Sequence, residues 1–351
     1  METAQKAKIP SRHIKLLLTD RCNAKCEYCH LEGQNKIVKA KERIDGEFVN
    51  KLLDNVECSR ISISGGEPTI NPNLEEICYS IREHGIWAIL DTNGRKTETI
   101  KNILPYINEI RFNIDSLNPD TYLKLKKVDI DPLLKSVEIA SERARKIENH
   151  LKVAFNTTIL AENSDINSIG SLISFAKKNK ATIRFIERFE KGQTQINPNA
   201  RLVRDIVWQL LGADSTIYNG TYHISGGGAR VEIFRSVCAA VIESIGLGRE
   251  NDEISHAYSQ DEIKERSASE YCHNYTKLYI APSGDIKPCF LKEDTVPLYD
   301  ALMSGDCEKA RENIEKAILL LGNGPCKEQE VKQEKDYGLN LGAFDYNGVW
   351  G

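Results

Sequence analysis

The sequence lacks the features that would place the protein in a membrane, in a secretion pathway or on nucleic acid. No run of apolar residues is long enough to span a bilayer. Residues 1–10 are polar and basic and contain no hydrophobic segment, so they do not form a secretory signal. The net charge is only −4, without the excess of either sign that favours nucleic acid or an anionic membrane. We therefore expect a cytoplasmic protein with no nucleic-acid partner and no membrane partner.

Cysteine, by contrast, is plentiful, with 10 residues in a chain of 351. Without a secretory signal, these cysteines are expected to be reduced and to serve as metal ligands or buried thiols rather than disulfides. Three of them, Cys22, Cys26 and Cys29, follow an apolar, strand-like run at C-x3-C-x2-C spacing. Three thiolates in one loop indicate a metal site.

The spacing also bears on the kind of metal. A structural zinc ion needs four protein ligands, and no fourth cysteine or well-placed histidine closes this loop. His30 directly follows Cys29, and adjacent residues seldom reach one metal together. An iron–sulfur cluster held by three thiolates leaves one iron open to a substrate or cosubstrate. The loop therefore favours a cluster, with zinc or a bare structural site as the alternative.

Strand and helix patterns alternate six times between residue 14 and about residue 192. Such alternation predicts parallel βαβ units and an α/β fold. Polar residues gather where the predicted strands end, which is where a β/α barrel places its active site. The first of these groups, Gly65-Gly66-Glu67-Pro68, has two glycines that let the backbone approach a ligand, although alone it is typical of an ordinary turn.

The cysteine loop followed by a strand and Gly-Gly-Glu-Pro closely resembles the radical S-adenosylmethionine (SAM) superfamily. Residues 92–94, 115–117, 156–157 and 184–187 are similar in order and spacing to MoaA, the GTP cyclase family of molybdenum-cofactor biosynthesis. The resemblance implies a partial (β/α)6 TIM-type barrel. It also implies an enzyme that cleaves SAM reductively on a [4Fe-4S] cluster to a 5′-deoxyadenosyl radical, with an electron donor of flavodoxin or ferredoxin type.

The resemblance assigns roles to individual residues. The cluster would be held by Cys22, Cys26 and Cys29. SAM would be contacted by Tyr28, Gly65, Gly66, Glu67, Pro68, Asn93, Ser116 and Asn156. Arg184 and Glu187 end the last strand and are the candidate catalytic residues, with a salt bridge at the barrel rim as the alternative.

A second group of cysteines follows the predicted barrel. Cys272 and Cys289 bracket a predicted hairpin at C-x11-G-x4-C spacing, which resembles the auxiliary-cluster motif of SPASM and twitch domains. Cys307 and Cys326 are available as further ligands. The resemblance implies an auxiliary iron–sulfur cluster, with idle thiols as the alternative. The other three cysteines are expected to be buried thiols: Cys58, Cys78 and Cys238.

The patterns divide the chain into four predicted parts. These are an N-terminal extension (1–13), the radical SAM partial barrel (14–192), a smaller α+β auxiliary-cluster domain (193–335) and a Gly- and aromatic-rich tail (336–351). Because the predicted barrel begins near His13, we expect no leader-binding domain of a peptide-modifying enzyme before it. This expectation favours a small-molecule substrate.

The departures from MoaA concern charge. GTP carries a triphosphate, which a cyclase neutralises with several Arg and Lys side chains. The Lys expected on the fifth strand is Ala154, and the Asn-Arg-x-Arg of that family is replaced by residues 276–279, Thr-Lys-Leu-Tyr. We therefore predict a less anionic, nucleoside- or sugar-like substrate in cofactor or natural-product biosynthesis. A GTP cyclase proper and a peptide-modifying enzyme are the alternatives. A non-enzymatic scaffold would leave the polar strand ends unexplained.

Overall fold

The computed structural model describes residues 9–10, 13–29, 41–146, 151–188, 198–211, 214–218, 221–234, 277–288 and 295–321. Six parallel strands form the middle of its main sheet: β2 (His13–Leu17), β4 (Arg60–Ser64), β5 (Trp87–Thr92), β6 (Glu109–Asn113), β7 (Lys152–Ile159) and β8 (Thr182–Glu187). They lie side by side in this order. The predicted α/β fold with six parallel strands is therefore confirmed.

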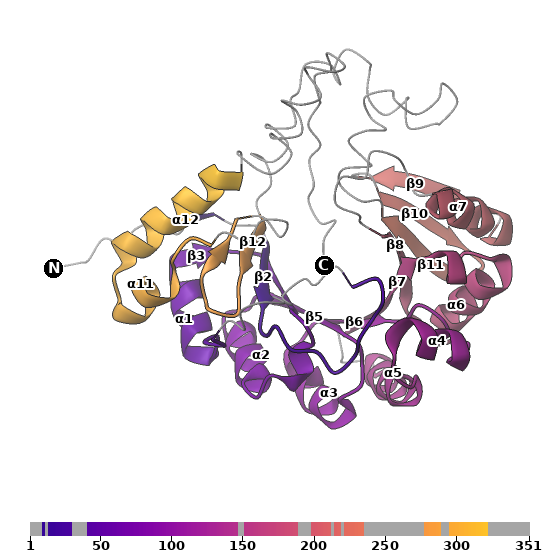
Figure 1. The fold of residues 1–351 in the computed structure, drawn as a ribbon, viewed down its shortest axis with the longest axis horizontal. Helices are drawn as coiled ribbons and strands as arrows, with labels where there is room; N and C mark the ends of the chain where they lie inside the picture. The colour runs from indigo at the N-terminus through magenta and orange to yellow at the C-terminus, as the bar shows by residue number, and fades with distance from the viewer. Residues whose placement is uncertain are drawn as a thin grey trace, which may run out of the picture.

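Helices connect these strands and cover the outer side of the curved sheet (Figure 1). They are α1 (Gly46–Asn55), α2 (Leu74–Glu83), α3 (Thr97–Ile103), α5 (Asp131–Ala144) and α6 (Ile166–Lys178). Their start signals are local, as in α1, where the Asp45 carboxylate accepts a hydrogen bond from Phe48 N at 2.8 Å. None of the described helices has the length and apolar character needed to cross a membrane.

The connection between β6 and β7 contains a further helix that the sequence patterns do not predict. Helix α4 (Pro119–Lys126) begins after Asn118, whose side chain accepts a hydrogen bond from Thr121 N at 2.9 Å. It ends at Lys127, which takes the left-handed conformation with φ 58°. An Asn followed by Pro is a helix start signal, but eight residues are too few for a clear apolar period.

Strands from beyond residue 192 extend both edges of the main sheet. At one edge β11 (Ala229–Phe234) pairs in parallel with β8 and continues into β10 (Thr221–Gly226) and β9 (Asp214–Tyr218), beside helix α7 (Pro198–Leu211). At the other edge β12 (Lys277–Ile280) pairs in parallel with β2 and forms the predicted hairpin with β13 (Ile286–Lys287). Over the described residues, the sheet thus has 11 strands. The division into domains at residues 192 and 193 stays a prediction.

A two-stranded sheet and two helices lie beside the main sheet. Strand β1 (Ile9–Pro10) pairs with β3 (Val56–Glu57) in a separate two-stranded sheet. Helices α11 (Tyr299–Ser304) and α12 (Cys307–Leu321) follow β13, and α11 packs beside α1 (Figure 1). The Phe48 ring of α1 stacks on Tyr299 of α11, with 5.6 Å between the ring centroids.

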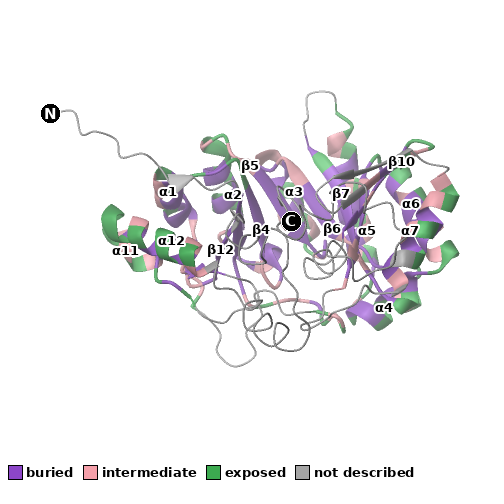
Figure 2. Ribbon diagram, turned by 90° about the horizontal axis from the view of Figure 1, so that it is seen from above, coloured by how far each residue is buried: buried purple, intermediate pink, exposed green. Residues whose placement is uncertain are grey.

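The two faces of the sheet differ in chemistry. On the outer face, alternate residues such as Ile110 and Phe112 of β6 are fully buried in the apolar core beneath the helices. On the inner face, the intervening positions of the same strands are polar or charged, as at Glu109 and Arg111. Figure 2 shows the strands buried and the outward faces of the helices exposed. A polar inner face is what positions a candidate site inside the curved sheet.

Candidate active site

The three cysteines lie on residues 18–29, the loop that leaves the carboxyl end of β2. This loop is bonded to the turn that follows β4. Gly66 N donates to Thr19 O at 2.7 Å, and Glu67 N donates to Arg21 O at 2.8 Å. The cysteine loop and the Gly-Gly-Glu-Pro turn, separate motifs in the sequence, therefore form one structure at the ends of two neighbouring strands.

The two glycines of this turn are required by the close approach of the two backbones. Gly65 has φ +131°, and a Cβ atom there would lie 2.7 Å from Thr19 O. A Cβ atom on Gly66 would lie 2.1 Å from Arg21 O. Both distances are shorter than any side chain tolerates, so only glycine fits. The sequence suggested close approach to a ligand, and the structure adds a close approach to the cysteine loop.

Glu67 is almost completely buried, with 1% of its surface exposed, and both of its carboxylate oxygens are engaged. Oε1 accepts hydrogen bonds from Thr69 N at 3.1 Å, Thr69 Oγ1 at 2.5 Å and Thr92 Oγ1 at 2.7 Å. Oε2 accepts one from Asn93 N at 2.7 Å. Burial raises the pKa of Glu67, although these hydrogen bonds oppose the rise. The side chain ties the turn after β4 to the end of β5.

Asn93, at the end of β5, faces the first cysteine. Its Nδ2 donates to Asn23 Oδ1 at 2.7 Å and lies 3.8 Å from the Sγ atom of Cys22. Its Oδ1 accepts a hydrogen bond from Arg95 N at 3.1 Å. The side chain predicted to contact SAM is therefore also a donor toward the cysteine loop.

The three cysteine thiols lie close enough to influence one another. Burial raises the pKa of Cys22 to about 11, and the nearby Cys26 and Cys29 thiolates add to the rise. Burial also raises the pKa of Cys26, against the effect of the Lys126 cation. Among the described residues, no three Cys, His, Asp or Glu side chains converge as they would around a single metal ion. Three neighbouring thiols on one loop are the donor set of a cluster with an open iron, so these residues fit a [4Fe-4S] group.

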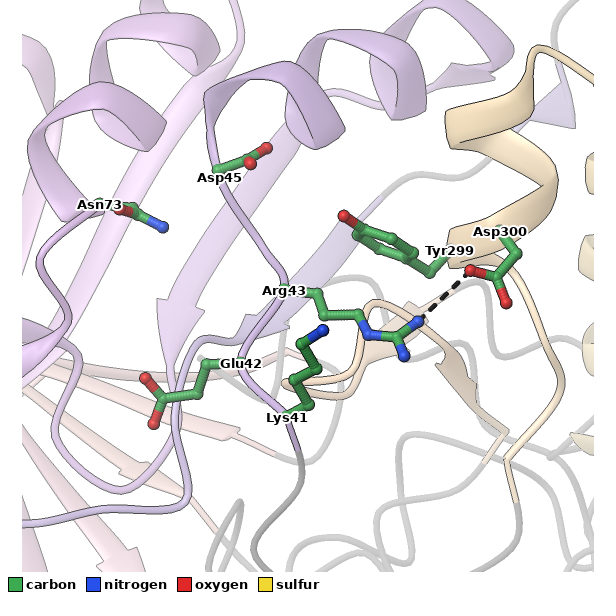
Figure 3. A pocket seen from close by; sticks show the side chains of 7 residues that line it. All are labelled: Lys41, Glu42, Arg43, Asp45, Asn73, Tyr299 and Asp300. Atoms are coloured by element: carbon green, nitrogen blue, oxygen red, sulfur yellow. Dashed lines mark hydrogen bonds and ion pairs between the residues drawn. The ribbon is translucent and has the colours of Figure 1, made fainter.

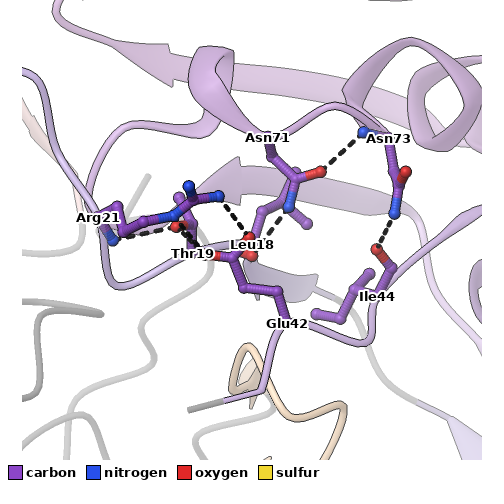
Figure 4. A network of polar contacts seen from close by, with 7 residues as sticks. All are labelled: Leu18, Thr19, Arg21, Glu42, Ile44, Asn71 and Asn73. Carbon is purple, nitrogen blue, oxygen red and sulfur yellow. Dashed lines mark hydrogen bonds and ion pairs between the residues drawn. The ribbon is translucent and has the colours of Figure 1, made fainter. Parts of the chain in front are cut away.

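Glu42 secures the other side of the cysteine loop, and no sequence signal pointed to it. Its carboxylate accepts hydrogen bonds from Thr19 Oγ1 at 2.5 Å and from Arg21 Nε and Nη2 at 3.0 Å and 2.9 Å (Figure 4). Burial opposes its ionisation, but the hydrogen bonds from Arg21 and Thr19 outweigh this and hold the pKa of Glu42 below its usual value. In the same network, Asn71 Nδ2 donates to Leu18 O at 3.1 Å.

A buried ion pair lies beneath the last two cysteines. Lys126 Nζ is 2.6 Å from Asp115 Oδ2, and the two side chains are 2% and 1% exposed. The Tyr28 hydroxyl donates to the same Asp115 oxygen. Lys126 Nζ also lies 5.1 Å from the centroid of the Tyr28 ring. Tyr28, predicted to contact SAM, is thus anchored at its hydroxyl end.

Two arginine–glutamate pairs cross the inner face of the sheet. Arg111 Nε donates to Glu109 Oε1 at 2.6 Å, and Arg184 Nε donates to Glu232 Oε2 at 3.1 Å. Arg184 Nη1 also donates to Asn156 Oδ1 at 3.2 Å, which brings two predicted site residues together. Burial, followed by repulsion from Arg111, lowers the pKa of Arg184 to about 10.

Asp91 and Arg111 carry buried polar atoms without a protein partner. They are register partners on β5 and β6, so both face the inner side, and only 8% and 7% of their surfaces are exposed. Within the described part of the chain, neither carboxylate oxygen of Asp91 nor Nη1 of Arg111 has a hydrogen-bond partner. Buried polar atoms without partners are uncommon in folded proteins and need an explanation. Neither residue was singled out from the sequence.

The other predicted site residues are placed as follows. Ser116 is buried, and its Oγ accepts a hydrogen bond from Asn118 N at 3.1 Å. Pro68 starts a short 3-10 helix after the turn. Glu187 is the last residue of β8 and is 1% exposed, but strand alternation puts it on the face opposite Arg184. Arg184 joins the inner-face network through its hydrogen bonds to Glu232 and Asn156.

The cysteines predicted for an auxiliary cluster are described only in part. Cys307 is the exposed first residue of α12. Cys272, Cys289 and Cys326 lie outside the described residues, as does Cys238. Cys58 and Cys78 are buried, as predicted.

A cavity of about 440 Å³ lies between residues 41–45 and helix α11 (Figure 3). Its walls include Arg43, which pairs with Asp300 at 3.3 Å and whose guanidinium carbon lies 5.0 Å from the centroid of the Tyr299 ring. None of the residues predicted to bind the cluster or SAM lines it. The cavity therefore lies where the segment that carries Glu42 meets the C-terminal helices.

Comparison with known proteins identifies the family whose sequence pattern this site shares. Residues 16–165, from β2 to the end of β7 and a few residues beyond, match the Radical SAM superfamily. Residues 16–165 form a radical SAM domain. It is similar to a protein named "Probable GTP 3′,8-cyclase" from Methanococcus maripaludis, with 26% identity over 293 residues that cover 81% of this chain and 87% of the relative. A protein of the same name from Methanothermobacter marburgensis is also 26% identical, over 88% of this chain and 94% of the relative.

Solved radical SAM structures share the fold. Streptococcus suis SuiB bound to S-adenosylmethionine superposes with a TM-score of 0.56 at 18% identity, over 84% of this chain, and the chain spans 64% of the SuiB chain. The structure of anSMEcpe with bound AdoMet gives a TM-score of 0.53 at 14% identity, covering 88% of this chain and 84% of that one. These are partial TIM-barrel folds, so the predicted partial barrel is confirmed. The superfamily implies a [4Fe-4S] cluster and SAM, and the MoaA-like resemblance of this radical SAM enzyme is confirmed as well.

Proposed function

We propose that this radical SAM enzyme abstracts hydrogen from a small nucleoside- or sugar-like molecule that is less anionic than GTP, in cofactor or natural-product biosynthesis. The cluster would be held by Cys22, Cys26 and Cys29 and, when bound, would supply the electron that cleaves SAM to a 5′-deoxyadenosyl radical. A flavodoxin- or ferredoxin-type protein would supply that electron in turn.

The chain's own residues would orient these groups and shield them from water. Glu67 and the glycines before it hold the turn and the cysteine loop together, so the cysteines and the methionyl end of SAM would lie side by side. The side-chain amide of Asn93 would donate a hydrogen bond toward the sulfur atom of Cys22. Ser116, just after β6, and Asn156, within β7, would contact the remainder of SAM. Arg184 would contact SAM or the substrate from the inner face of the sheet. Glu187 would act at the rim of the barrel.

The charges of the inner face support a substrate without a triphosphate. Among the described inner-face residues, the buried or half-buried cations are Lys15, Arg111 and Arg184, and the anions are Asp91, Glu109 and Glu232. Both arginines are committed to carboxylates of the protein. A triphosphate is bound by cations that are free to pair with it. Balanced charge of this kind suits a neutral or weakly charged ligand.

The single observation that carries the proposal is the pair of unpartnered oxygens on Asp91. A buried carboxylate is stabilised when hydrogen-bond donors reach it, and hydroxyl or amino groups of a sugar or nucleoside are such donors. Arg111 Nη1, unpartnered on the neighbouring strand, would donate to an oxygen or ring nitrogen of the same molecule. Ala154 is the register neighbour of Arg111 on β7 and has a short side chain.

The named relatives make a GTP cyclase the second candidate, because their similarity spans most of the chain. Reconstituted protein, kept without oxygen and supplied with SAM and dithionite, separates the two candidates. The readout is 5′-deoxyadenosine formed with guanosine or GTP, which differ only in the triphosphate, and with a panel of other nucleosides and sugars. We expect uncharged nucleosides or sugars to stimulate cleavage more than GTP does. Conversion of GTP to a cyclised product would establish the cyclase instead. No stimulation by the whole panel would refute the proposed class.

Variants connect this assay to Asp91. Asp91→Asn keeps the size of the side chain but replaces one acceptor oxygen by a donor, so substrate-dependent 5′-deoxyadenosine should fall at least about tenfold, the size of effect that one lost charged hydrogen bond produces. Arg60→Gln, at the exposed amino end of β4, is the matched control and should retain wild-type turnover. Equal turnover in the two variants would remove Asp91 from the substrate site.

A further inference from the structure

We propose that the buried ion pair of Lys126 and Asp115 positions the second half of the cysteine loop and sets the reduction potential of the cluster bound there. The proposal rests on the proposed cluster at Cys22, Cys26 and Cys29. Neither residue lies in a sequence motif for cluster ligands. Lys126 in particular belongs to α4, the helix that the sequence patterns do not predict.

The ion pair is unusual because a lysine is rarely buried so completely. Lys126 Nζ and Asp115 Oδ2 are 2.6 Å apart, and the two side chains are 2% and 1% exposed. Removing a charge from water costs several kcal/mol, so a buried lysine persists only with a close partner. A pair of this kind adds little net stability compared with apolar residues of the same volume. Its presence therefore calls for a role other than stability.

The pair is attached directly to the cysteine loop. The Tyr28 hydroxyl donates to the same Asp115 oxygen that Lys126 contacts. The end of α4 also supplies two backbone acceptors: Lys25 N donates to Lys126 O at 3.1 Å, and Glu27 N donates to Leu125 O at 3.0 Å. Residues 25–28, which include Cys26 and lead directly to Cys29, are thus held at the C-terminal end of this one helix.

Asp115 is in turn fixed by β7 and the residues that follow it. Its Oδ1 accepts a hydrogen bond from Thr158 N at 2.8 Å, and its carbonyl oxygen accepts one from Asn163 Nδ2 at 2.9 Å. One carboxylate oxygen of Asp115 therefore accepts a hydrogen bond from the sheet, and the other contacts Lys126 and Tyr28. This arrangement connects the cysteine loop, α4 and β7 through a single side chain.

The Lys126 cation lies beside the cysteine loop. Its Nζ is 5.1 Å from the centroid of the Tyr28 ring, and its carbonyl oxygen accepts a hydrogen bond from Lys25 N at 3.1 Å, on either side of Cys26 in the chain. Hydrogen bonds and charges around a cluster are among the factors that set its potential. A nearby cation favours the reduced, more negative cluster, so Lys126 should raise the reduction potential.

The test compares Lys126→Met with Lys127→Met. Both replace a lysine by an unbranched apolar residue, but the Lys127 side chain is 46% exposed and pairs with the exposed Glu27. The readouts are iron and sulfide per chain after anaerobic reconstitution, circular dichroism, and an EPR-monitored redox titration. We expect Lys126→Met to bind less iron and to shift the midpoint potential to more negative values, while Lys127→Met matches the wild type.

A second variant tests the ion pair without leaving the buried Asp115 carboxylate unpaired. Lys126→Met/Asp115→Asn carries no unpaired buried charge, so it should fold even where the single variant does not. Its potential should lie between those of Lys126→Met and the wild type, since the two removed charges oppose each other. Wild-type iron content and wild-type potential in both variants would overturn the inference. Failure of the wild type itself to bind iron would instead refute the proposed cluster.

Discussion

At the scale of single residues, Glu67 shows how one side chain can organise two motifs. Four donors from Thr69, Thr92 and Asn93 converge on its two oxygens, although it lies in the motif predicted to contact SAM. A carboxylate with this many donors cannot be replaced by an isosteric amide without placing a donor against a donor. The residue is therefore structural whatever it contributes to SAM binding.

Glu67→Gln tests this structural task. We expect the free energy of unfolding to fall by about 2 kcal/mol, because a hydrogen bond to a charged group contributes roughly 1.5–3 kcal/mol. Urea denaturation of the metal-free protein measures the change. Glu75→Gln, on the exposed side of α2, is the control and should change stability by less than about 0.5 kcal/mol. Equal losses in the two variants would contradict the assignment.

Glu42 gives a prediction that depends on pH. Its pKa in the folded protein lies below the usual value, because Arg21 and Thr19 donate to the carboxylate. Such a group contributes stability above its unfolded pKa of about 4.3, and the contribution is lost as the pH falls through the folded pKa. The difference in unfolding free energy between wild type and Glu42→Gln should therefore be full at pH 7 and shrink below about pH 4.

Denaturation at several pH values measures this difference, and Glu83→Gln, exposed near the end of α2, is the control. The wild type and the control should change in parallel with pH, so that only Glu42→Gln converges on the wild type in acid. A difference that does not change between pH 7 and acid would show that the contribution of Glu42 does not come from its charge.

At the scale of elements, the turn after β4 and the cysteine loop depend on glycine. Gly66→Ala would place a methyl group against a carbonyl oxygen, which cannot move without breaking the hydrogen bonds between the two segments. We expect a loss of at least about 2 kcal/mol in unfolding free energy, as for other overpacked buried positions.

Gly170→Ala is the matched control for this substitution. Gly170 lies within α6, and its Cβ would meet Leu210 Cδ1 at 3.7 Å, an ordinary contact. Alanine is favoured over glycine inside a helix by about 1 kcal/mol, so this variant should be more stable than the wild type. Thermal unfolding of both variants measures whether their changes in stability have opposite signs. A neutral Gly66→Ala would show that the two backbones can separate.

How much of each element was predictable depends on how local its signals are. The six strands of the predicted alternation all form, and they lie in the sheet in the order in which they follow one another along the chain. Helix α4 was missed because its eight residues carry only weak apolar periodicity. The connection of β11 to β8 and of β12 to β2 was also missed, because strand pairing between distant segments leaves no local pattern.

At the scale of the whole molecule, the main prediction concerns the number of iron–sulfur clusters in each chain. Two [4Fe-4S] clusters would give about eight irons per chain, and the variant Cys22→Ala/Cys26→Ala/Cys29→Ala should retain about four, on the auxiliary cluster proposed for Cys272, Cys289, Cys307 and Cys326. Iron and sulfide analysis after anaerobic reconstitution gives the count.

Cys58→Ala, at a buried thiol next to β4, is the control and should keep the full wild-type iron content. About four irons in the wild type and none in the triple variant would remove the auxiliary cluster and leave the radical SAM cluster. Zinc in place of iron, with no SAM cleavage, would contradict the cluster interpretation entirely.

The sequence by itself predicted the three cysteine ligands, the order of strands and helices in the barrel, and the resemblance to radical SAM enzymes. These follow from the spacing of neighbouring residues, which the chain carries along its length. Only the tertiary structure decided which side chains support the ligands. Glu42 and Lys126 are separated by many positions from the residues of the cysteine loop that they contact. Their roles arise because the parallel strands bring distant strand ends together and exclude water from the charges between them.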